Sequence, residues 1–115
     1  MKIRLSPIAA ILASPAAFAG GTWSNVTVLH EQECTSECSS PNGFAKFELS
    51  AASTGGPSCA TYKNWVAVDI TTPGGEAAAA LLHYARISGA KLVSVLGTGA
   101  CTVSSSNETL SLVNY

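Results

Sequence analysis

Hydrophobic and polar residues alternate along several short stretches of this chain, which is the pattern of β-strands with one buried face. In the stretch from Phe44 to Ser50, for example, Ala45, Phe47 and Leu49 share one face and leave the charged residues on the other. The remaining predicted strands cover Thr22 to Leu29, Trp65 to Ile70, Lys91 to Leu96 and Glu108 to Tyr115. Branched and aromatic residues favour strands, so the chain is predicted to be mainly β.

One segment follows the helical period instead. Its apolar residues recur at positions i, i+3, i+4 and i+7 and are Ala78, Leu81, Leu82 and Ala85. Thr72 is a candidate N-cap, Pro73 suits the first helical position, and Gly89 supplies a left-handed stop. We therefore expect a helix over Gly74 to Ser88 that packs through this stripe. The face expected to point outward carries Glu76, Ala79, Ala80 and His83.

The order of these elements predicts a fold class. It runs β-β-β-α-β-β, with the helix between the third and fourth strands, which is the order of the OB-fold, a five-stranded Greek-key barrel. A mixed sheet with one helix on its face is the alternative, because periodicity alone does not show whether a sheet closes. The expectation is an OB-fold-like five-stranded barrel, mainly β with one α-helix.

The first residues have the features of an export signal. Two basic residues precede a short apolar run from Ile8 to Leu12, and Ala17-Phe18-Ala19 places small residues at the positions that a signal peptidase reads. We expect residues 1–19 to be a signal peptide and residues 20–115 to form a single domain. No segment approaches the roughly 20 apolar residues of a membrane-spanning helix, so the product is expected to be secreted or periplasmic.

Charge argues against a nucleic-acid partner. Of the six basic residues, Lys2 and Arg4 belong to the expected signal, which leaves four against seven acidic residues and a formal net charge of −3. Binding a phosphate backbone needs clustered Lys and Arg side chains. The four that remain are scattered along the chain and are Lys46, Lys63, Arg86 and Lys91.

The chain has four cysteines, and an even number in a short exported chain is typical of disulfides. Sequence alone allows three ways of pairing them. We favour Cys34 with Cys38, because a spacing of four residues closes a tight loop. We also favour Cys59 with Cys101, because these two cysteines bracket one strand–helix–strand unit.

Several motifs resemble a group of small exported bacterial proteins of unknown function. They are Trp65-x3-Asp69, Thr72-Pro73-Gly74-Gly75, Gly97-Thr98-Gly99-Ala100-Cys101 and the ending from Glu108 to Tyr115. The resemblance covers the chain from Pro57 to Tyr115 and includes Cys59 and Cys101, whereas Cys34 and Cys38 look like an addition.

The element order and the length are also similar to the B subunits of AB5 toxins, which are disulfide-bonded OB-folds. That resemblance implies a pentameric ring that binds cell-surface glycans. It concerns the architecture alone, because no sugar-binding residue of that family has a matching position in this chain. Fold-level similarity is a weak indication of function.

Two groups of residues are candidates for chemistry. His30, Cys34 and Cys38 form an H-x3-C-x3-C pattern, which offers ligands of the kind that zinc and copper bind. A fourth ligand is not evident and oxidised cysteines do not bind metal, so a disulfide is the favoured interpretation and no cofactor is expected. A Ser-His-Asp triad would need the only aspartate, Asp69, beside a histidine, and no nucleophile-elbow spacing accompanies it.

The glycines of Gly97-Thr98-Gly99 follow a predicted strand but open no helix, so a phosphate-binding loop is not indicated. We expect these glycines to let the backbone turn tightly beside Cys101.

Aromatic residues give the best indication of binding. Trp23, Tyr62 and Trp65 are candidate ligand-binding residues, because exposed rings stack against sugars or partner side chains; core packing is the alternative. We expect a secreted, non-enzymatic binding module for a glycan or a protein, with self-association through the outward helix face. Two alternatives stay open, a periplasmic structural or inhibitory protein that acts on a protein partner and a small metal-binding protein that uses the H-x3-C-x3-C residues.

The export signal generates the first testable prediction. The exported protein should begin at Gly20, because Ala17 and Ala19 fit the small-residue positions of the cleavage site and Phe18 between them is not read. Mass spectrometry and N-terminal sequencing of the protein exported from the full chain measure this. An exported chain that begins at Met1 would contradict it.

Overall fold

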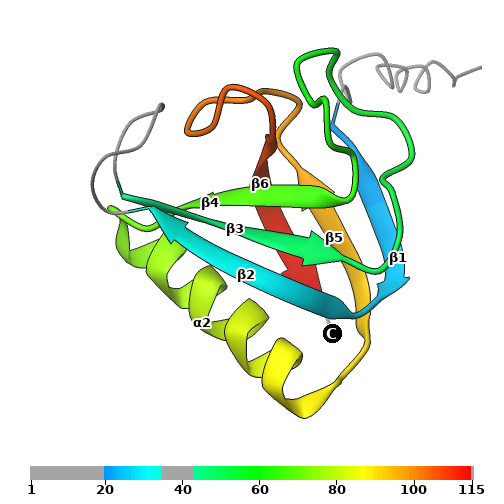
Figure 1. Ribbon diagram of the computed structural model, residues 1–115, viewed down its shortest axis with the longest axis vertical. Coiled ribbons are helices and arrows are strands. Elements are labelled where there is room, and N and C mark those ends of the chain that lie inside the picture. Colours follow the sequence, from blue (N-terminus) through cyan, green and yellow to red (C-terminus); the bar gives the residue numbers. More distant parts are fainter. Residues whose placement is uncertain (1–19, 35–42, 115) are drawn as a thin grey trace, which may run out of the picture.

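Six β-strands and one helix make up residues 20–34 and 43–114, the part of the chain that the computed structural model describes (Figure 1). The elements are β1 (Thr22–Val26), β2 (Val28–Cys34), β3 (Phe44–Leu49), β4 (Trp65–Asp69), α2 (Pro73–Ser88), β5 (Leu92–Gly97) and β6 (Glu108–Asn114). The strands form one sheet in the order β1-β5-β6-β4-β3-β2. The prediction of a mainly β chain with one helix is confirmed.

The prediction of a closed five-stranded barrel is wrong, because the expected first strand is two strands. Thr27 separates β1 from β2, and its backbone N–H donates to the Ser50 hydroxyl at 3.0 Å. β1 pairs with β5 and β2 pairs with β3, so these two consecutive strands lie at opposite edges of the sheet. No ladder joins them within the described ranges. The sheet is therefore curved but open along the seam at Thr27.

Apart from the break at Thr27, the strands pair as in the OB-fold, the fold that the element order predicts. β6 runs parallel to β4 and antiparallel to β5, and the other neighbours are antiparallel. If β1 and β2 are counted as halves of one bent strand, this is the strand order of an OB-fold. Figure 1 shows β2, β3 and β4 crossing β6, β5 and β1, with α2 alongside. The core fills the space between these two groups of strands and the helix, and its largest apolar members are Trp23, Phe47, Leu49, Leu82 and Leu92.

The helix begins and ends where its capping residues predict. The Thr72 hydroxyl accepts a hydrogen bond from the Gly75 N–H at 3.0 Å, and Gly89 adopts a left-handed conformation with φ 73°. Just before the cap, the hydroxyl and the backbone N–H of Thr71 both donate to the Asp69 carboxylate. These two hydrogen bonds, the one from the hydroxyl most strongly, lower the pKa of Asp69. No helix in the described part of the chain is long and apolar enough to cross a membrane.

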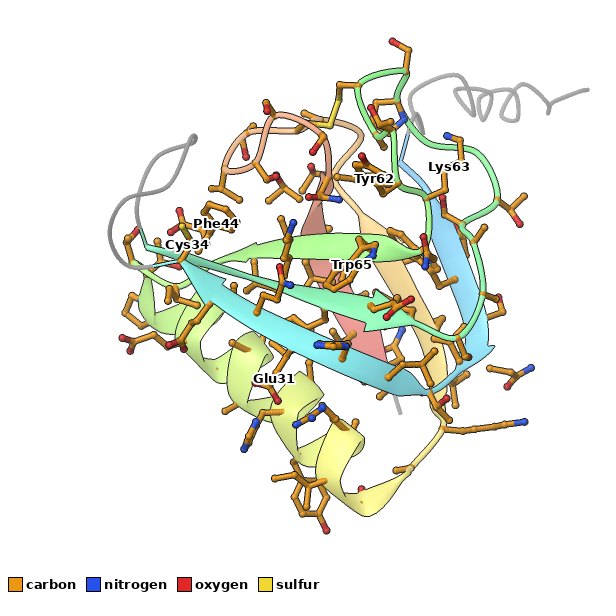
Figure 2. The ribbon with its side chains drawn as sticks, viewed as in Figure 1. Glu31, Cys34, Phe44, Tyr62, Lys63 and Trp65 are labelled. Carbon is orange, nitrogen blue, oxygen red and sulfur yellow. A yellow bond between two sulfur atoms is a disulfide. The ribbon has the colours of Figure 1, made fainter. Side chains whose placement is uncertain are left out.

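The predicted disulfide between Cys59 and Cys101 is confirmed. Their Cα atoms are 6.2 Å apart, and the bond joins the loop before β4 to the loop after β5 (Figure 2). Cys34 is also disulfide-bonded, so it carries no free thiol. Its expected partner, Cys38, lies outside the described residues, as does the expected signal peptide.

The two cysteine pairs are expected to differ in their effect on stability. Replacing Cys59 and Cys101 by serine should lower the free energy of unfolding by about 4 kcal/mol, because the bond closes a loop of 42 residues. Replacing Cys34 and Cys38 should cost about 2 kcal/mol, as expected for a loop of a few residues. Urea unfolding of the two double variants measures this difference, and equal losses would count against the loop-length argument.

Candidate functional site

A groove of about 420 Å³ lies between α2 and the edge strand β2. Its floor is apolar and consists of Ala45, Phe47, Ile70 and Ala79. Its rim is polar and consists of Glu31, Glu33, Glu76 and His83, with Ala80 beside them. The volume lies in the range of small-molecule and side-chain binding sites.

A bulge in β2 places the two glutamates of that strand in the groove. The register between β2 and β3 shifts after Val28, so that Leu29 is an extra residue whose side chain is 55 % exposed. Beyond the bulge, Glu31 lies opposite Phe47 and Glu33 lies opposite Ala45. Opposite residues of an antiparallel pair point to the same face, so both glutamates face the core side of the sheet, toward α2.

The charges of the groove are only partly balanced. The Glu31 carboxylate lies between β2 and α2, where its Oε1 is 2.6 Å from His83 Nδ1 and 3.3 Å from an Arg86 guanidinium nitrogen (Figure 2). Glu33 and Glu76 form no ion pair with any residue in the described ranges. One end of the groove therefore carries a glutamate paired with Arg86, and the rest carries two carboxylates for which the described residues supply no cation.

The helix face expected to point outward lines this groove instead. Ala79 is half-buried and packs against the core, so the expectation that it lies on a free outer surface is wrong. Ala80 and His83 are exposed, but they line the groove on the side that faces β2. The reason is the position of α2, which packs on β2 and β4 and thereby turns this face toward the edge of the sheet.

The structure separates the three aromatic residues proposed to bind a ligand. Trp23 is 1 % exposed and its Nε1–H donates to the Lys63 carbonyl at 2.8 Å, so it is a core residue and the expectation of an exposed ring is wrong. Tyr62 is 56 % exposed in the loop before β4. Trp65 is half-buried, and Lys46 Nζ lies 5.3 Å from its ring centroid.

The proposed metal ligands are not arranged as a chelate. His30 and Cys34 lie near opposite ends of β2, and four residues of a strand span about 13 Å. The His30 ring lies instead 6.2 Å from the Trp65 ring, centroid to centroid. Within residues 20–34 and 43–114, no group of three or more His, Cys, Asp or Glu side chains is placed to hold a metal ion.

Sequence reasoning missed a second polar feature, the buried carboxylate of Glu108 at the start of β6. Glu108 is 1 % exposed, and its Oε2 accepts hydrogen bonds from the Gly21 N–H at 2.9 Å and the Gly99 N–H at 2.8 Å. A Cβ atom added to Gly97 would lie 2.1 Å from the same oxygen. Gly21, Gly97 and Gly99 thus form a glycine cradle around the carboxylate. The Gly97-Thr98-Gly99 motif makes room for Glu108 in addition to shaping the turn.

Comparisons with protein-family models, with curated proteins and with solved structures find no match to this chain. The resemblances to exported bacterial proteins and to toxin B subunits therefore stay predictions. The groove and the glycine cradle are the two features from which a function can be argued.

The glycine cradle predicts the effect of adding one methyl group. Gly97→Ala should lower the free energy of unfolding by about 3 kcal/mol, because the new Cβ would displace the buried carboxylate from its hydrogen bonds. Gly74→Ala is the matched control, since a Cβ there meets nothing within 4 Å. In the first turn of α2 it should be neutral or stabilise by up to about 1 kcal/mol. Chemical denaturation of both variants measures this, and a tolerated Gly97→Ala would refute the packing argument.

Proposed function

We propose that this protein is a secreted or periplasmic, non-enzymatic binding module that holds a lysine or arginine side chain of a protein partner in the groove between α2 and β2. The observation that carries the proposal is the combination of an apolar floor with two carboxylates, Glu33 and Glu76, that have no cation within the described residues.

Lysine and arginine side chains match the apolar floor and the negative charge of this groove. Both have a long apolar stem and a cationic head, and the stem is commonly buried while the head stays near water. Phe47 and Ile70 offer a floor for the stem, and Glu33 and Glu76 offer acceptors for the head. Each exposed ion pair contributes only about 0.5–1 kcal/mol, so affinity depends on the stem and the two carboxylates acting together.

A protein partner fits the structure better than a glycan. Sugars bind largely by stacking on exposed aromatic rings, but Trp23 is buried and Lys46 lies over the ring of Trp65. Tyr62 and Tyr84 are exposed, but Tyr62 lies in the loop before β4 and Tyr84 lies on α2, and no ring contact joins them in the described part of the chain.

The other candidate functions have weaker support. A structural or inhibitory role would use the same groove on a protein partner, so it is a variant of this proposal. A metal carrier would need Cys34 reduced, whereas it is disulfide-bonded. A triad would need Asp69 beside a histidine, whereas its carboxylate accepts hydrogen bonds from Thr71. The disulfides agree with an oxidising compartment outside the cytoplasm.

A lysine side-chain mimic tests the proposal. Titration with butylammonium, followed by NMR, should shift the signals of Phe47, Ile70 and Ala80. The cation should bind about tenfold more tightly than 1-butanol, a neutral molecule of similar size, because only the cation pairs with the carboxylates. The double variant Glu33→Gln, Glu76→Gln should lose this preference.

Glu48→Gln is the matched control, because Glu48 lies on the opposite face of β3 and its carboxylate accepts from Asn64 at 3.2 Å. This variant should keep the preference for the cation. Equal binding of the amine and the alcohol to the wild-type protein would overturn the proposal. A concentration-dependent increase in mass by light scattering, lost in the Glu33 and Glu76 variant, would instead identify a second copy of the chain as the occupant.

A further inference from the structure

The Glu108 carboxylate is buried without a cation. It is 1 % exposed, and no Lys, Arg or His side chain in the described ranges forms an ion pair with it. Burying a carboxylate is costly unless hydrogen bonds or an opposite charge replace its water. Backbone N–H groups of Gly21 and Gly99 supply hydrogen bonds, but they supply no full positive charge.

The start of the described chain lies against this carboxylate. The Gly21 N–H donates to Glu108 Oε2 at 2.9 Å, and Gly20 precedes it, with its Cα within about 4 Å of the Cα of Gly21. A Cβ atom on Gly20 would lie 2.3 Å from the Gly97 carbonyl oxygen and 3.4 Å from the Gly99 nitrogen. Gly20 therefore lies on the glycine cradle itself. Its own N–H has no hydrogen-bond partner among the described residues.

The geometry points to a binding site for a chain terminus: the Glu108 carboxylate takes the α-ammonium group of a chain that begins at Gly20. The terminus is created when a signal peptidase hydrolyses the Ala19–Gly20 bond. One water molecule is consumed, the released signal keeps the new carboxylate, and the α-amine of Gly20 takes up a proton. The inference rests on that cleavage position and is independent of the groove.

Glycine suits this role for two reasons. The absence of a side chain lets Gly20 approach the Gly97 carbonyl, which any Cβ atom would prevent. An α-ammonium also presents three N–H donors where an internal residue presents one, so a free terminus reaches the carboxylate in more orientations. Removal of the signal then adds a positive charge at the place where the fold buries a negative one.

A comparison of free and blocked termini tests this inference. The full chain is produced in an exporting host, and the exported protein is purified and acetylated at its α-amine near neutral pH, where lysine side chains remain protonated. Acetylation should lower the folding equilibrium constant of the wild-type protein about tenfold, because it removes the charge beside Glu108. In Glu108→Gln, acetylation should have no effect, since the neutral amide has no charge to pair.

The pH dependence has a definite sign. A carboxylate partner raises the pKa of the α-amine above its unfolded value of about 8. The added stability should be fully present below that pH and should be lost as the pH rises through the folded pKa. Titration of the α-amine by NMR, against a peptide of residues 20–24, measures the shift directly and decides the matter even if Glu108→Gln does not fold.

Three results would overturn the inference. The first is an α-amine that titrates at or below the pH of the peptide. The second is an equal effect of acetylation in the wild-type protein and in Glu108→Gln. The third is an exported chain that does not begin at Gly20, which leaves the groove and its proposed function untouched.

Discussion

The buried carboxylate of Glu108 joins three segments that are far apart in the sequence. It accepts hydrogen bonds from Gly21, 87 residues away, and from Gly99, while Gly97 leaves the space that it fills. These contacts connect the segment before β1, the end of β5 and the start of β6. β1 is an edge strand that forms its ladder with β5, and its residue Thr22 also exchanges two backbone hydrogen bonds with Thr54. The carboxylate and this bridge together hold the edge strand in place. The position of β1 in turn brings Trp23 into the core.

The features that local chemistry determines could be predicted from the sequence. The bounds of α2 follow from Thr72 and Gly89, since a helix cap depends on residues within one turn. The alternation along β3 predicts its buried face for the same reason. The pairing of Cys59 with Cys101 could be inferred because the two cysteines bracket one contiguous unit.

The features that depend on distant pairing could not be predicted. Whether Glu31 and Glu33 face the helix or the solvent depends on the bulge at Leu29, and only the pairing of β2 with β3 reveals a bulge. Without it, His30 would share the inner face with Val28, and the groove would have a different charge. Periodicity likewise predicts Thr22 to Leu29 as one strand, because it does not show that the two halves pair at opposite edges of the sheet.

The distance between the groove and the glycine cradle has a consequence for how this sequence can diverge. The glycine cradle lies where β1 and β6 begin and β5 ends, and the Cys59–Cys101 bond lies toward the same end of the molecule, whereas Glu31 and α2 lie toward the other (Figures 1 and 2). Residues such as Glu33 and Ala80 border the groove but bury little surface, so replacing them leaves the framework intact. Substitutions around the groove can thus accumulate while the buried framework stays the same.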